Sequence, residues 1–225
     1  MRALKFLLAL VLLPVLLGAM LATARIGALA VRRAGDGISL DLAAFGAGLF
    51  LAVLSFVSLP RPRLGYVVGH ELTHGLVALL FGVRIHGLRA GARGGSIRLS
   101  RTNVAIALAP YILPLYALAA AGLYAGASLF VDLTAWRPVA VGVIAFGWGL
   151  HLLFTVQVFR PDQPDLRDHG FVFSAVVILL GNLVLVSVAA AWLGAVSWGD
   201  VATAWQRGVG EVAAGLAGRV HRTGQ

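Results

Sequence analysis

Apolar runs of roughly membrane-spanning length follow one another along this chain. A helix needs about 20 apolar residues to cross the hydrocarbon core of a bilayer, because each residue advances it by about 1.5 Å. Six runs of roughly this length recur with short loops between them: Phe6–Ala22, Leu42–Leu59, Tyr66–Gly82, Asn103–Phe130, Val139–Phe159 and Phe171–Val196. We therefore predict an all-α membrane protein, a polytopic bundle of about six transmembrane helices.

The composition excludes an ordinary soluble domain. Of the 225 residues, 60% are hydrophobic and 12% are charged, whereas soluble domains are about 45–50% apolar and about 25% charged. The net charge of +9 does not indicate nucleic-acid binding, because no basic stripe is interleaved with aromatic residues. We expect the loop arginines to face anionic membrane lipids instead. The chain has no cysteine, which excludes disulfides and thiolate metal ligands.

Two domains of unequal size are predicted. Residues 1–196 are expected to form one integral membrane domain, with its core over about residues 64–190. Residues 197–225 are expected to form an amphipathic helix on the membrane surface, because apolar residues recur there at intervals of three or four.

Ala22-Thr23-Ala24 resembles a signal-peptide cleavage site, but the length of the first run favours a retained span.

The segment after the third run predicts a short β-hairpin. Ser96–Ser100 alternates polar and apolar residues, and Gly91–Gly95 is typical of a turn. Counting Lys and Arg over six alternating spans places this hairpin, with Arg25 and Arg32, on the more basic side, which the positive-inside rule makes cytoplasmic. The same count places Arg207 and both termini on the other side.

The strongest chemical signal is the sequence His70-Glu71-Leu72-Thr73-His74. Residues four apart share one face of a helix, so the two imidazoles can bind one metal ion. Glu71 can reach a water held by that metal as a general base. With six His and two Glu in the chain, chance produces this pattern on the order of one time in a thousand. The alternative is that these three side chains only hydrogen-bond neighbouring helices.

A catalytic zinc site needs a third protein ligand and an open position for water. Two imidazoles and one carboxylate favour a single zinc ion. The candidates for the third ligand are Asp162, Asp165, Asp168, His169 and His151. We favour Asp165, in the loop that enters the last span, and keep His151 and Asp168 as alternative ligands or supporting groups. Asn103 and Asn182 can position a substrate or stabilise an oxyanion, but we favour a helix start for Asn103 and an interhelix hydrogen bond for Asn182 over these roles.

The residues Gly69–Gly75 (GHELTHG) and Phe81–Ile85 (FGVRI) resemble the active-site helix of site-2-protease-type intramembrane zinc metalloproteases. The resemblance is specific over about residues 66–100 and looser over 101–185. It implies a partly strand-like segment after the helix, which Gly91–Leu99 matches in position and composition. It also implies an Asp ligand on a later span, usually in an Asn-Pro…Asp-Gly context. Here Gln163-Pro164-Asp165-Leu166 stands instead, which resembles a small bacterial branch without a PDZ-like domain and favours Asp165.

This resemblance implies an intramembrane zinc endopeptidase that cleaves a transmembrane protein substrate. We expect it in the bacterial cytoplasmic membrane, with the active site opening toward the cytoplasm. The alternative is a non-proteolytic membrane metal-binding or ion-transport protein that uses the same His/Asp site, since intramembrane ionisable groups also mark ion pathways. A catalytically inactive scaffold is the third hypothesis.

Overall fold

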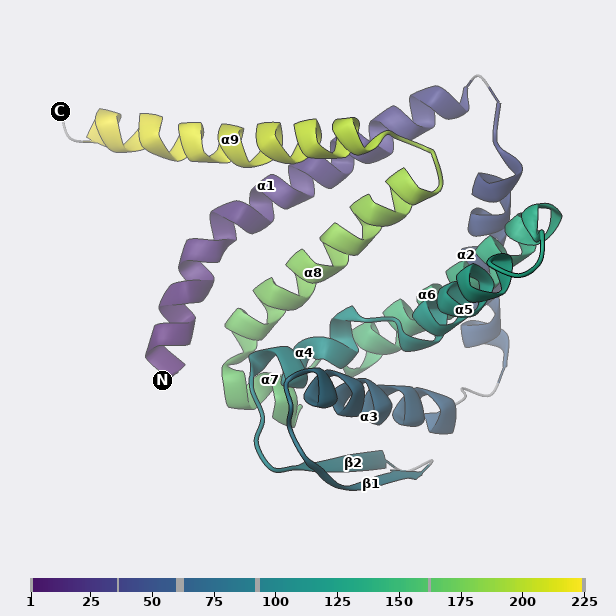
Figure 1. The fold of residues 1–225 in the computed structure, drawn as a ribbon. Coiled ribbons are helices and arrows are strands. Elements are labelled where there is room, and N and C mark those ends of the chain that lie inside the picture. Colours follow the sequence, from purple (N-terminus) through teal and green to yellow (C-terminus); the bar gives the residue numbers. More distant parts are fainter. Residues whose placement is uncertain (1, 36, 60–62, 92–93, 162, 224–225) are drawn as a thin grey trace. The chain divides into compact units, whose positions relative to one another are not determined.

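The computed structural model describes residues 2–35, 37–59, 63–91, 94–161 and 163–223 (Figure 1). Residue contacts divide the chain into two compact units, one of Leu40–Arg167 and one of Met1–Ser39 with Asp168–Gln225. The elements in chain order are α1 (Arg2–Ala34), α2 (Leu40–Ser58), α3 (Arg63–Leu80), β1 (Ile85–Gly91), β2 (Gly94–Leu99), α4 (Val104–Ile112), α5 (Leu115–Ser128), the 3-10 helix η1 (Thr134–Trp136), α6 (Arg137–Val158), α7 (Pro164–His169), α8 (Phe171–Trp192) and α9 (Trp198–Thr223).

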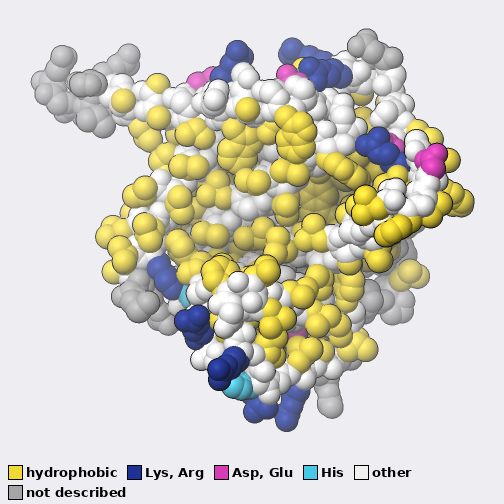
Figure 2. All heavy atoms as spheres, viewed as in Figure 1, with side chains coloured by type: hydrophobic (Ala, Val, Ile, Leu, Met, Phe, Trp, Pro, Cys, Tyr) yellow, Lys and Arg dark blue, Asp and Glu magenta, His cyan; other side chains and the backbone are white. Residues whose placement is uncertain are grey.

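Within the described residues, four helices are long and apolar enough to cross a membrane: α1, α2, η1 with α6, and α8. The pair α4 and α5, bent by 76°, makes a fifth if it counts as one span. Figure 2 shows hydrophobic side chains over much of the visible surface, as expected where lipid replaces water. An integral membrane protein is thus confirmed, with four or five spans instead of about six. The helix missing from the count of five is α3, whose His70, Glu71 and His74 lower its mean hydropathy; the count of four also omits the bent pair α4–α5.

Helices α2 and α6 approach each other through small residues. Each of the three α2 positions Ala44, Gly48 and Ala52 faces a small α6 residue, respectively Gly142, Ala145 and Gly149. A Cβ atom on Gly149 would lie 2.7 Å from the Cβ of Ala52, and one on Gly48 would lie 2.9 Å from the Cβ of Ala145. Small residues four apart let membrane helices pack backbone to backbone, where dispersion and lipid release stabilise the pair. This contact forms one wall of the unit that carries the site.

Substituting Gly48→Leu should destabilise this unit. The new side chain would collide with the Gly142 carbonyl and the Ala145 methyl, and overpacking of this kind costs about 1–3 kcal/mol or more. Gly46→Leu is the matched control, because a Cβ there meets no atom within 4 Å and both substitutions gain similar helix propensity. Thermal unfolding in detergent should show a lower midpoint for Gly48→Leu alone; equal midpoints would contradict the close packing.

The other unit pairs α1 with α9, and the first half of α9 lies beside the second half of α1 (Figure 1). Helix α1 continues to Ala34, well beyond the end of the first apolar run at Ala22. Arg25 and Arg33 lie on this extension and pair with Glu211 and Asp200 of α9, at 2.5 and 2.8 Å. Ile26 and Leu29 of the same extension pack in a hydrophobic cluster with α9, so the extension is held by apolar contacts as well as by these ion pairs. The proposed cleavage site lies in the middle of α1, and Ala22 is fully buried there.

The predicted tail helix is present as α9, and part of its apolar stripe faces α1. Ala204 and Gly208 are buried, and a Cβ atom on Gly18 of α1 would lie 2.6 Å from the Cα of Val209. This packing also corrects the predicted placement of Arg207. Arg207 lines the same groove as Arg25 and Arg32, whereas the loop count placed it on the opposite side of the membrane.

The predicted β-hairpin is confirmed. Strands β1 and β2 pair antiparallel, from Ile85 opposite Leu99 to Gly91 opposite Gly94, and both contact α3.

After the hairpin the chain forms α4, and the helix is interrupted between α4 and α5. Leu113 is extended there (φ −88°, ψ 111°), because the ring of Pro114 disfavours a helical conformation in the preceding residue.

Candidate metal centre

Helix α3 brings His70, Glu71 and His74 to the interior of the unit. Glu71 and His74 are buried, and the His70 side chain is 13% exposed. The helical spacing turns both imidazoles the same way, with ring centroids 4.9 Å apart. The predicted shared face of the two histidines is therefore present.

Asp165 completes a group of three potential metal ligands. Its Oδ2 atom lies 3.5 Å from His70 Nε2 and 3.6 Å from His74 Nε2, and the three ligand atoms all lie within 4.8 Å of one another. Ligand atoms on a tetrahedral zinc ion at about 2.0–2.1 Å are about 3.4 Å apart. The donor set and its spacing thus fit one zinc-sized ion.

The orientation of His74 also suits metal binding. Its Nδ1 lies 2.8 Å from the carbonyl oxygen of Ile106 in α4. Only a protonated Nδ1 can donate to a carbonyl, so the lone pair of a neutral ring is left on Nε2, the atom that faces Asp165. Asn103 supports this contact, because its side chain accepts a hydrogen bond from the Ile106 amide and caps α4.

Tyr111 holds the carboxylate of Asp165, a role that the sequence analysis missed. This tyrosine is 1% exposed, and its hydroxyl donates to Asp165 Oδ2 at 3.0 Å. Burial alone would raise the pKa of Asp165, but the neighbouring imidazoles of His70 and His74 outweigh it and hold that pKa below its ordinary value. Asp165 is accordingly a carboxylate, the form that binds metals. A tyrosine in an apolar helix has no sequence signature that distinguishes this role from core packing.

Glu71 lies under the hairpin, where β2 packs closely over α3. A Cβ atom on Gly95 would lie 2.7 Å from Glu71 Cγ, and the backbone amide of Ile97 interacts with the Glu71 carboxylate. Two cavities of about 800 and 580 Å³ open beside this residue, and both are lined by His70 and Glu71. The carboxylate is therefore sheltered by the hairpin but reachable from cavities that could hold water or a peptide.

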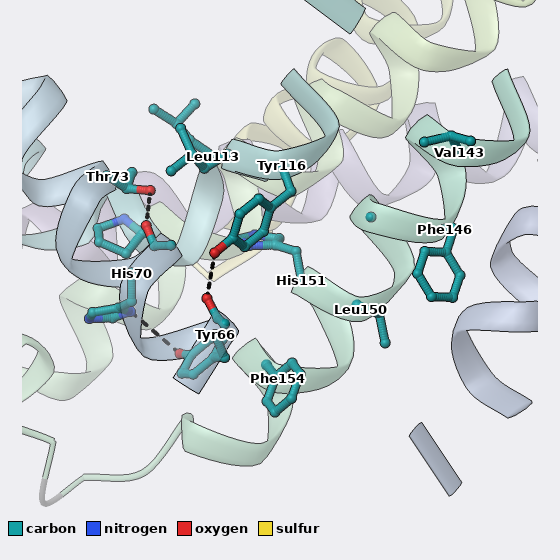
Figure 3. Close-up of a pocket in the computed structure, with 15 residues that line it drawn as sticks. Tyr66, His70, Thr73, Leu113, Tyr116, Val143, Phe146, Leu150, His151 and Phe154 are labelled. Carbon is teal, nitrogen blue, oxygen red and sulfur yellow. Dashed lines mark hydrogen bonds between the residues drawn. The ribbon is translucent and has the colours of Figure 1, made fainter. Parts of the chain in front are cut away.

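A third, largely apolar cavity of about 270 Å³ lies on the other side of His70. Figure 3 shows Tyr66, Tyr116 and Phe154 around it, with His151 near Tyr116. His151 is not in the metal-binding group; its Nε2 is buried and has no hydrogen-bond partner among the described residues. This cavity could therefore accept an apolar side chain of a bound peptide beside His70, where no other charged group lines it.

The remaining predicted residues have other surroundings. Asp168 and His169 are not in the metal-binding group of the described residues, and His169 Nδ1 lies 2.6 Å from Lys5 Nζ. Asp162 lies outside the described residues. The Asn182 amide donates to the Ile178 carbonyl within α8. The structure thus assigns local contacts to Asn103 and Asn182, and their substrate-positioning role stays a prediction.

Comparisons of the chain with family models, curated proteins and solved structures find no match. The likeness over residues 66–100 therefore stays a resemblance, and the function is inferred from the side chains of the site.

The metal content of two variants tests whether Asp165, and not its neighbour Asp168, is a metal ligand. If the group binds zinc, Asp165→Ala should reduce the bound zinc to a small fraction of about one ion per chain, since it removes one of three protein ligands of a catalytic type of site. Asp168→Ala, a change of the same kind in the same short helix, should leave the zinc content unchanged. Elemental analysis of the purified proteins measures both. Loss of zinc from the Asp168 variant alone would contradict our ligand assignment.

Removing the Tyr111 hydroxyl should weaken metal binding without unfolding the site. Tyr111→Phe keeps the ring but leaves Asp165 without this donor, and loss of such a supporting hydrogen bond typically costs about 10–100-fold in metal affinity. Tyr124→Phe is the control, because its hydroxyl donates to the Leu133 carbonyl, outside the metal-binding group. Competition with a chelator of known affinity measures the constants. Equal affinities in the two variants would show that Tyr111 does not hold Asp165.

Proposed function

We propose that this protein is an intramembrane zinc endopeptidase that hydrolyses a peptide bond of a membrane-spanning substrate. The observation that carries the proposal is the convergence of His70, His74 and Asp165, with Glu71 next to His70 on the same helix. Three ligands of these types leave one position of a tetrahedral ion open, as catalytic zinc sites do. A structural zinc site would instead use four protein ligands.

In this proposal, His70, His74 and Asp165 hold the zinc ion. Zinc supplies Lewis acidity, which lowers the pKa of a coordinated water and polarises a carbonyl group. The His74 contact to the Ile106 carbonyl and the Tyr111 contact to Asp165 keep the three ligands in position. Each supporting hydrogen bond reduces the reorganisation needed when the ion binds.

Glu71 is the general base. Its carboxylate takes the proton of the attacking water and then delivers it to the amine that leaves the cleaved peptide bond. The neighbouring cavities support this role, because both of them border Glu71 and His70. The cover provided by β2 limits access of bulk water to the carboxylate, which strengthens electrostatic interactions in the site.

The substrate must unwind before it is cleaved. Peptide bonds of a spanning helix are hydrogen-bonded within the helix and shielded by its side chains, and they cannot be exposed in lipid without losing those bonds. The cavity of about 800 Å³ is lined by polar groups, including Arg63, Gln157 and Arg160. These groups could replace the lost hydrogen bonds. We further propose that the site opens to the cytoplasmic side of a bacterial membrane.

Glu71→Gln tests the mechanism against Glu211→Gln, which changes the other glutamate of the chain. Loss of a general base typically reduces the rate about 10²–10⁴-fold, while the zinc ligands remain. We therefore expect Glu71→Gln to retain zinc and lose cleavage of reporter-tagged membrane segments, and Glu211→Gln to retain both. The readout is the appearance of cleaved fragments in membranes that contain each variant.

Two results would count against the proposal. Normal cleavage by the Glu71 variant would exclude this general base. If the wild-type protein binds zinc and cleaves none of the segments but carries metal ions into proteoliposomes, the metal-transport alternative is correct.

A further inference from the structure

A basic groove of about 650 Å³ lies between α1 and α9. Both helices belong to the unit that does not contain His70, His74 and Asp165. Three arginines line it, Arg25 and Arg32 from α1 and Arg207 from α9. Figure 2 shows basic side chains gathered over the α1–α9 pair. The proposed peptidase chemistry uses none of these residues.

Each of the two carboxylates beside this groove already forms an ion pair with an arginine of α1. Glu211 pairs with Arg25 Nη2, and Asp200 pairs with Arg33. Hydrogen bonds from Ser197, and then from Arg33, lower the pKa of Asp200 to about 2, so its charge is committed to these partners at neutral pH. Arg32 and Arg207 have no carboxylate partner among the described residues. The groove therefore has an excess of positive charge.

Arg25 adds an unsatisfied donor. Its Nη1 atom is buried and has no hydrogen-bond partner among the described residues. A buried charged donor without an acceptor is costly, and such groups in native proteins usually have a partner, including a bound ion or water. An anion in the groove would supply acceptor oxygens near three guanidinium groups.

The groove is also apolar along one wall. Ile26, Leu29 and Ala204 line it beside the arginines, and they belong to the hydrophobic cluster that joins α1 to α9. We propose that this groove binds an anionic phospholipid, with its phosphate between Arg32 and Arg207 and its glycerol region against the apolar wall. Guanidinium groups bind phosphate oxygens through charge-assisted, often paired hydrogen bonds. A free phosphate ion shares this chemistry but would gain nothing from the apolar wall.

Native mass spectrometry of the full chain, released from detergent micelles, tests the assignment. The probes are phosphatidylglycerol and phosphatidylcholine with identical acyl chains, and inorganic phosphate at millimolar concentration. We expect one phosphatidylglycerol to bind in preference to phosphatidylcholine. Arg32→Gln and Arg207→Gln should each weaken its binding about fivefold, since one arginine near an anionic lipid contributes roughly that factor. The double variant should lose the preference.

Arg84→Gln with Arg89→Gln is the matched control, because it removes the same charge from the hairpin region and should keep the lipid preference. Arg32→Lys with Arg207→Lys should retain most of the preference, which provides a second folded variant with the charge intact. Equal binding of the two lipids, or an unchanged preference in the Gln double variant, would overturn the proposal. Displacement of phosphatidylglycerol by inorganic phosphate would assign the groove to a free anion and overturn the lipid assignment. None of these outcomes depends on peptidase activity.

Discussion

The unit that carries the site depends on satisfying polar groups inside an apolar helix. A carboxylate and two imidazoles on α3 would be costly to bury without partners, because the interior offers no water to replace their hydration. The structure supplies these partners from three other elements: α4 gives the Ile106 carbonyl and the Tyr111 hydroxyl, α7 gives Asp165, and β2 covers Glu71. These contacts join α4, α7 and β2 to the polar groups of α3.

The surrounding architecture follows from how closely the elements can approach. Small residues bring α2 against α6, and α6 in turn supplies His151 and Phe154 to the apolar cavity beside His70. The break at Leu113 and Pro114 turns α5 away from α4 by 76°. A straight helix could not present Tyr111 to Asp165 from α4 and also bring Tyr116 of α5 to the Gly65 carbonyl of α3, a hydrogen bond of 2.6 Å. Backbone packing and a proline break thus shape a site whose chemistry lies in a few side chains.

The unit that contains α1 and α9 also combines close packing through small residues with charged groups that need partners, and here the unpaired charges are positive. Its helices meet through Gly18 and Gly208, and ion pairs at Arg25 and Arg33 extend α1 beyond its apolar part. The cationic surplus that remains on Arg32 and Arg207 has no protein partner among the described residues. In a membrane, lipid headgroups are the most abundant source of compensating charge. An anionic lipid can therefore neutralise the positive charge of Arg32 and Arg207, just as a metal cation can neutralise the carboxylate of Asp165 in the other unit.

The sequence by itself determined the features that depend on local periodicity. The long apolar runs predicted membrane helices, the alternation at Ser96–Ser100 predicted a strand, and the four-residue spacing of His70 and His74 predicted a shared helix face. Only the tertiary structure places Asp165, and not His151, in one group with His70 and His74, because the two candidates differ in which elements meet across the interior and not in their local pattern. The same holds for Tyr111, which looks like any core aromatic in the chain, and for α9, whose apolar stripe suits a membrane surface and a neighbouring helix equally well. Contacts between distant segments depend on close packing, and single-sequence periodicity carries no information about which segments pack together.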